Sequence, residues 1–181
     1  MRRSRSLLSP AIFLVIAACG DVSSTTPAEQ AEARAAIPPL ITPVTGSHRD
    51  GDHALSLRWL AADFELGPET WTWNEVEVVA ESGPSTSEAV TFRRRVSLDP
   101  RALAKEVRAA FVQDSWALTL VCEDQPCITV ETEQTVLMNG DRTSESFPPE
   151  RVRTHDILFS DYPERDKAIA LIRRAIGAPP R

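Results

Sequence analysis

The chain has 181 residues, of which 42% are hydrophobic and 25% charged, and its formal net charge is −6. This length is enough for one domain with a buried core. The acidic balance argues against general nucleic-acid binding and against adhesion to anionic lipid by bulk charge, because both depend on a surplus of Lys and Arg.

The first 18 residues have the organisation of a secretory signal. Three arginines within the first five residues precede an apolar run from 7 to 18, and small residues end that run directly before Cys19. The run is about 12 residues long and contains Pro10, whereas a membrane-spanning helix needs about 20 residues. We therefore expect export and cleavage. Removal of residues 1–18 leaves 163 residues, and the loss of the three arginines moves the formal charge from −6 to −9.

The residues before Cys19 are Ile16, Ala17 and Ala18, and this stretch resembles the lipobox of bacterial lipoprotein precursors. The resemblance implies that Cys19 receives a diacylglyceryl thioether and becomes the acylated amino terminus, with enough acyl chains for stable anchoring. It also implies a location in the cell envelope. Gly20 stands where enteric-type inner-membrane retention uses aspartate, which favours the periplasmic face of the outer membrane. The alternative is an ordinary cleaved signal with a cysteine nearby.

Residues 19–53 are rich in Ala, Pro, Ser, Thr and Glu, and almost free of aromatic residues. Such a composition cannot bury enough apolar surface to order itself, so we predict a flexible tether spanning roughly 30 Å. The piece from Ala28 to Ala36 could form a transient helix that Pro38 and Pro39 would stop.

The end of this predicted tether carries a dense group of possible metal ligands: His48, Asp50, Asp52 and His53. A tether offers no scaffold to hold ligands in geometry, so we interpret the group as a solvated loop. A weak, adventitious zinc or nickel site is the alternative. No cofactor is expected.

A single globular domain is predicted over residues 54–178, beginning with three strands. Leu55, Leu57 and Trp59 alternate with polar residues, although 57–64 also suits a helix. The second strand begins at Trp71 and ends before Gly83. The third covers 90–98, with Arg94 on its apolar face.

A short helix is predicted next, because Asp99 is a suitable N-cap and Pro100 suits the first helical position. Apolar residues from Leu103 to Phe111 follow at helical spacing. Residues 116–122 and 127–132 are then predicted to form a hairpin.

With Cys19 carrying lipid, Cys122 and Cys127 remain as an even pair, and an exported protein favours a disulfide between them. Their four intervening residues differ from the two of a thioredoxin-type redox motif. A zinc half-site would need two further ligands. The disulfide would hold Val121 opposite Ile128 in the predicted hairpin.

The remaining elements are a turn at Asn139–Gly140, a mobile loop through Pro149, a strand over 152–159 and a terminal helix. Asp161 begins this helix and Gly177 ends it, with an apolar stripe between them.

These elements predict an α+β fold that is mainly antiparallel β: a small barrel or half-open sandwich of about six strands packed by the C-terminal amphipathic helix. The order of elements is similar to the pleckstrin-homology-like architecture, which implies a binding scaffold without naming a ligand. Another β-sandwich with peripheral helices is the alternative.

Candidate site residues are few. Trp71 and Trp73 share a strand face and could stack against a glycan, or they could pack in the core. Arg94 could bind an anion, or it could meet an acid such as Glu77. His155 is expected to be half-exposed on a strand. No nucleophile elbow, phosphate loop or zinc-protease motif is present in the sequence.

The sequence therefore predicts a non-catalytic, lipid-anchored envelope protein that binds a protein partner and no nucleic acid. A binder of a small ligand or glycan through Trp71, Trp73 and Arg94 is the second hypothesis, and a hydrolase is the third.

Overall fold

The computed structural model describes residues 25–84, 87–112 and 115–178, and it has an α+β fold dominated by antiparallel strands. The large sheet has the strand order β1 (Val44–Asp50), β2 (His53–Leu66), β3 (Trp71–Ser82), β4 (Ser87–Leu98), β7 (Ile128–Met138) and β8 (Asp141–Ser146), and β9 (Glu150–Val152) also pairs with β7. The small sheet contains β10 (Thr154–Phe159), β6 (Ser115–Val121) and β5 (Arg108–Val112), in that order. The helices are α1 (Pro27–Ala36), η1 (Pro38–Leu40), η2 (Pro100–Ala102) and α2 (Tyr162–Ala175).

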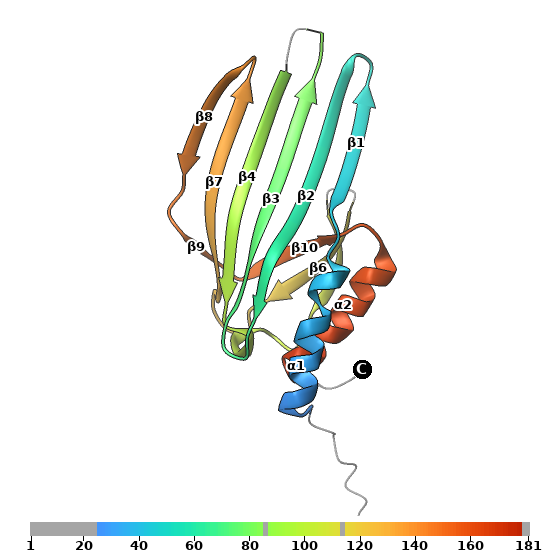
Figure 1. The fold of residues 1–181 in the computed structure, drawn as a ribbon, viewed down its shortest axis with the longest axis vertical. Helices are drawn as coiled ribbons and strands as arrows, with labels where there is room; N and C mark the ends of the chain where they lie inside the picture. The colour runs from blue at the N-terminus through green and yellow to red at the C-terminus, as the bar shows by residue number, and fades with distance from the viewer. Residues whose placement is uncertain (1–24, 85–86, 113–114, 179–181) are drawn as a thin grey trace, which may run out of the picture.

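The small sheet and both α-helices lie at one end of the long strands (Figure 1). The core between these parts contains Trp59, Trp73, Val96, Leu118 and Phe159, all buried. Beyond this packed end, β1–β4, β7 and β8 continue as a projecting sheet that neither the small sheet nor a helix covers (Figure 1). Among the described residues the strands thus form two open sheets, with ten strands where about six were expected.

The amino-terminal part differs from the predicted tether. Residues from Pro27 onward form α1, η1 and β1, and α1 packs against α2. Thr26 and Glu29 form a capping box that starts α1, and Ala33 and Ile37 are buried in the core. The sequence indicated a transient helix over 28–36, but the average composition gave no sign that it packs, because a few apolar side chains suffice when they all face a neighbouring helix.

The predicted helix after Asp99 is wrong. Asp99 does cap a helical turn, but η2 has three residues, and Arg108–Val112 forms strand β5 against β6. Pairing with a distant strand overrides the local apolar spacing, as tertiary context often does for short segments.

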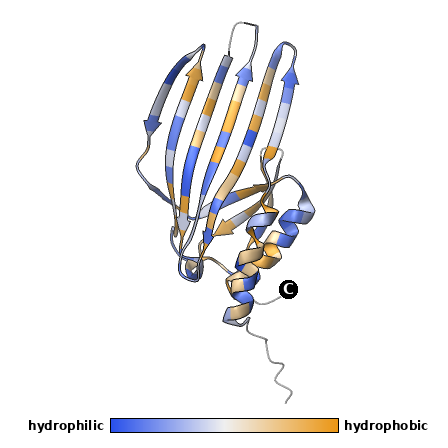
Figure 2. Ribbon diagram, in the orientation of Figure 1, coloured by the Kyte–Doolittle hydropathy of each residue, from blue (hydrophilic) through white to orange (hydrophobic). Residues whose placement is uncertain are grey.

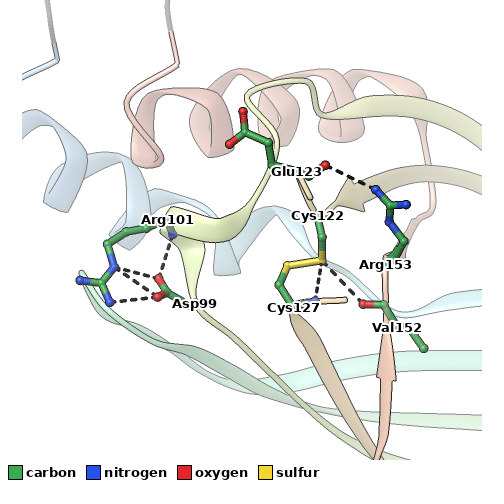
Figure 3. Close-up of a disulfide and its surroundings, with 7 residues drawn as sticks. All are labelled: Asp99, Arg101, Cys122, Glu123, Cys127, Val152 and Arg153. Atoms are coloured by element: carbon green, nitrogen blue, oxygen red, sulfur yellow. Dashed lines mark hydrogen bonds and ion pairs between the residues drawn. A yellow bond between two sulfur atoms is a disulfide. The ribbon is translucent and has the colours of Figure 1, made fainter. Parts of the chain in front are cut away.

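The predicted hairpin is also wrong, whereas the disulfide within it is present. β6 pairs with β5 and β10, and β7 pairs with β4, so the two segments belong to different sheets. Cys122 and Cys127 are joined, and the Cys127 N–H lies 3.0 Å from the Cys122 sulfur (Figure 3). The disulfide therefore lies between the end of β6 in the small sheet and the start of β7 in the large sheet.

The other predictions for the C-terminal half are largely confirmed. Asn139 and Gly140 have positive φ angles and join β7 to β8. The predicted mobile loop contains β8 instead. Asp161 accepts a hydrogen bond from the Glu164 N–H at the start of α2, and Gly177 follows its end with a φ of 70°. The three strands predicted between 54 and 98 are β2, β3 and β4.

Candidate functional site

A cleft of about 370 Å3 opens between the two sheets where the small sheet ends. Its lining comes from both sheets and includes six ionisable side chains: Glu75, Glu77, Arg94, Glu150, His155 and Asp156. Four of the six are acids, so the cleft has an acidic character.

Glu75 lies at the bottom of this cleft, on β3, with a side chain only 2% exposed. Its Oε1 atom lies 2.8 Å from His155 Nε2 on β10 and accepts a hydrogen bond of 2.7 Å from Trp73 Nε1. The ring of Trp73 also meets that of His155 edge-on, with centroids 5.7 Å apart. The carboxylate is thus satisfied by partners from both sheets, as a buried charge must be.

Arg94 and Glu77 form the second ion pair of the cleft, in which Glu77 is buried and Arg94 is half-buried. The Arg94 Nη1 atom lies 2.7 Å from Glu77 Oε2, and the guanidinium carbon lies 5.0 Å from the centre of the Phe92 ring. The sequence alternative in which Arg94 meets Glu77 is the one observed. With its charge already paired among carboxylates, Arg94 is poorly placed to bind a free anion.

The remaining acids differ in their surroundings. Asp156 accepts a hydrogen bond of 2.6 Å from the Thr119 hydroxyl, whereas Glu150 is exposed at the rim. The cleft therefore combines a histidine–carboxylate pair with further acids. Such a pair can transfer protons, but here both partners are used to join the sheets.

Trp71 and Trp73 do not form a stacking platform. Each is 2% exposed, and their indole N–H groups donate to the Gly67 carbonyl and to Glu75, respectively. Phe64 stacks on the Trp73 ring. The two tryptophans therefore pack in the core, and neither ring offers a free face to a sugar.

The projecting part of the large sheet carries a second candidate site. Cross-strand register places two rows of side chains on the same face as Trp59 and Glu77, beyond the small sheet. One row contains Leu57, Val79, Val90 and Val136, and the other contains Leu55, Glu81, Glu88 and Met138. We call these eight residues the distal inner face.

Six of the eight residues of the distal inner face are apolar; four of these six are half-buried, and the two at the ends of the outer row are exposed. Leu55 and Met138 are 47% and 49% exposed, although they share a face with the buried core further down the same strands. Figure 2 shows hydrophobic bands that continue along the projecting strands. In an antiparallel sheet with one solvated face, the apolar set normally marks the face that packs against something.

The opposite, outer face of the sheet has a different character. It has a shallow hollow of about 550 Å3 lined in part by Arg93, Arg95, Glu131 and Glu133. Arg93 lies opposite Glu133 and Arg95 opposite Glu131 in the β4–β7 register, so the charges balance. This face thus combines paired charges with scattered apolar residues, among them Leu137, which is 44% exposed.

Sequence reasoning named Glu77 as a possible partner of Arg94 but missed the other acids of the inner face. Trp71, Trp73, Glu75 and Glu77 occupy alternate positions and share one face, whereas Val76 faces the other way. The period-2 pattern that pairs the tryptophans thus also predicts inward-facing carboxylates. Following the alternation, instead of grouping all the apolar residues of the strand, would have found them.

The two remaining sequence predictions concern the lipidated cysteine and the group of possible metal ligands. Cys19 and the proposed lipobox lie outside the described residues. His48, Asp50, Asp52 and His53 occupy the β1–β2 hairpin and its turn, and no group of three potential metal ligands comes together in the part of the chain that the structure describes.

Comparison of the chain with protein-family models, curated proteins and solved structures found no match. Among residues 25–84, 87–112 and 115–178, none of the helices combines the length and apolar character needed to cross a membrane.

Proposed function

We propose that this chain is a lipoprotein of the bacterial envelope, anchored through lipid on Cys19 at the periplasmic face of the outer membrane. Its domain binds another envelope protein and performs no catalysis. The observation that carries the binding proposal is the distal inner face, where Leu55 and Met138 are exposed and the apolar side chains of the neighbouring row are only half-buried.

The anchor proposal is supported by the lipobox-like residues before Cys19. A disulfide between Cys122 and Cys127 is also typical of proteins in an oxidising compartment. Cys19→Ser should move the protein from the membrane fraction to the soluble fraction and abolish incorporation of labelled palmitate. Membrane retention of the unlabelled variant would rule out lipid anchoring.

The binding proposal is supported by the position of the exposed apolar residues in the sheet. Contiguous exposed apolar patches are uncommon on monomeric soluble proteins and mark interaction sites when they occur. The pattern on the strands is regular, so the exposed residues are a continuation of the core pattern and not scattered surface positions.

A pair of neighbouring residues provides the test. A photo-crosslinking amino acid at Leu57, on the distal inner face, should give a discrete crosslinked protein band in intact cells. The same group at Ser56, which faces the opposite side, should not. Equal crosslinking from both positions, or none from Leu57, would contradict the proposal.

The domain is further proposed to be a pleckstrin-homology-like scaffold, which is a more specific statement than an α+β fold of antiparallel strands. A series of antiparallel strands followed by one terminal helix supports a pleckstrin-homology-like scaffold, a type of domain that serves for binding. The described strands form two open sheets, so the support comes from the order of elements and not from barrel closure.

Binding of a small ligand is the second candidate function, and the inter-sheet cleft favours it. Trp71 and Trp73 cannot stack against a ligand there, which leaves Arg94, His155 and the acids as recognition groups. Replacement of Thr132, which lines the cleft, by Trp would block such a ligand without touching the distal inner face.

A further inference from the structure

The distal inner face has an unusual arrangement of charge. Glu81 on β3 and Glu88 on β4 lie directly opposite one another in register, with Leu55 and Met138 on their two sides. Like charges directly opposite each other destabilise a sheet. Two carboxylates therefore sit between Leu55 and Met138, at a cost to the stability of the isolated fold.

The described residues do little to neutralise this pair. The Nδ1 atom of His53 lies 3.5 Å from Glu81 Oε1, in an exposed contact. Glu88 has no ion pair within 4.0 Å in the described part of the chain. The buried pairs further down the same face show the contrast, because there Glu77 has Arg94 and Glu75 has His155.

We propose that the distal inner face binds a segment of a partner protein that places a Lys or Arg side chain between Glu81 and Glu88. Apolar side chains of the same segment, on either side of the cation, would cover Leu55, Met138 and the valine row. This inference rests on the proposed function, since it takes the partner to be a protein and specifies the chemistry of its contact.

Charge complementarity selects this occupant over two others. A second copy of the chain, packed face to face by a two-fold axis, would bring two carboxylate pairs together. A phospholipid would bring its phosphate to the same two carboxylates. A basic side chain would instead form an ion pair like that of Arg94 with Glu77, which lies further along the same face.

Two labelled octapeptides provide the probe. In both, every second residue is Ser, and the positions between alternate Leu with Lys in the Leu–Lys peptide and Leu with Glu in the Leu–Glu peptide. Because side chains two positions apart lie on the same face of an extended segment, each peptide presents Leu and its charged residue together on one face. Fluorescence anisotropy with the purified domain should show saturable binding of the Leu–Lys peptide and none of the Leu–Glu peptide.

Matched variants separate this site from general attraction to an acidic protein. Glu81→Gln/Glu88→Gln should weaken Leu–Lys binding roughly tenfold or more, as loss of about 1.4 kcal/mol or more implies. The control, Glu131→Gln/Glu133→Gln, removes the same charge from the outer face of the same sheet and should leave binding unchanged. Equal losses in both double variants would overturn the proposal.

The apolar part has its own matched pair. Val79→Ser, on the distal inner face, should weaken binding of the Leu–Lys peptide, whereas Val78→Ser, on the outer face, should not. Thermal unfolding of each variant checks that the fold is retained, and the two glutamine variants decide the question if Val79→Ser proves unstable.

Other occupants give distinct results. Concentration-dependent dimers in sedimentation velocity that Val79→Ser abolishes would identify a second copy and overturn the proposal. Binding to anionic phosphatidylglycerol vesicles that Val79→Ser abolishes would identify lipid, with the same consequence. If no crosslink forms from Leu57 in cells, the proposed protein-binding function is wrong. If a crosslink forms but the domain binds the Leu–Lys and Leu–Glu peptides equally, only the inference of a basic partner segment is wrong.

Discussion

The Nε2 atom of His155 lies 2.8 Å from Oε1 of Glu75, and this contact joins the small sheet to the buried middle of the large sheet. Both side chains come from strands 80 residues apart in the sequence. The pair therefore reports directly on the docking of the two sheets.

Replacing His155 by Ala should lower the free energy of unfolding by about 3 kcal/mol, because the buried Glu75 carboxylate loses its partner from the other sheet. Urea denaturation measures the loss. His53→Ala is the control, since its contact with Glu81 is exposed and should contribute less than about 1 kcal/mol. Equal losses in the two variants would show that the buried contact is no stronger than the exposed one.

Arg94→Met should destabilise the protein by about 3 kcal/mol, because the buried Glu77 loses its cation. The double variant Arg94→Met/Glu77→Leu should recover most of this loss, and a double-mutant cycle measures the coupling. Arg93→Met, one residue away on the exposed outer face, should change stability by less than about 0.5 kcal/mol. A double variant as unstable as Arg94→Met alone would count against the pairing.

Removing the disulfide with Cys122→Ser/Cys127→Ser should cost about 2 kcal/mol, the loop-entropy value for a closed loop of about six residues. Denaturant unfolding measures the change. Dithiothreitol should lower the stability of the unaltered protein to that of the double variant and leave the variant itself unaffected. Two alkylatable thiols at 122 and 127 in the untreated protein would show that the bond does not form.

Asp99 gives a pH prediction at the surface. Hydrogen bonds from the Arg101 side chain and backbone N–H hold the pKa of Asp99 below its ordinary value of 3.8. A depressed pKa in the folded state contributes stability above pH 3.8, and this contribution is lost as pH falls through the folded pKa. Carbon-detected NMR should show the pKa of Asp99 rising in Arg101→Gln. Arg108→Gln is the control and should leave that titration unchanged.

The sequence predicted the elements whose determinants are local. Alternating apolar residues located β2, β3 and β4, and Asp161 and Gly177 located α2, because strand pleat and helix caps depend on neighbours along the chain. Pairing with distant strands was beyond this reasoning. The β5 segment has helical spacing of apolar residues but forms a strand because it pairs with β6. The β6 and β7 segments were predicted to form a hairpin because nothing local assigns them to different sheets.

The candidate sites show the same division. The pairing of Arg94 with Glu77 followed from strand alternation, and the disulfide followed from the parity of the cysteines. The contact of Glu75 with His155 depends on how two sheets cross, which no spacing in the sequence encodes. The distal inner face could not be recognised either, because an uncovered apolar row and a covered one have the same pattern.

Helix α1 begins at Pro27, at the end of the molecule opposite the tips of the projecting strands (Figure 1). Seven peptide units separate Cys19 from Thr26, so a lipidated Cys19 would keep the start of α1 within at most about 25 Å of the anchor. A twelve-residue strand such as β3 is about 40 Å long. The bilayer and the strand tips would then lie on opposite sides of the helices, and a partner would have to approach from the periplasm.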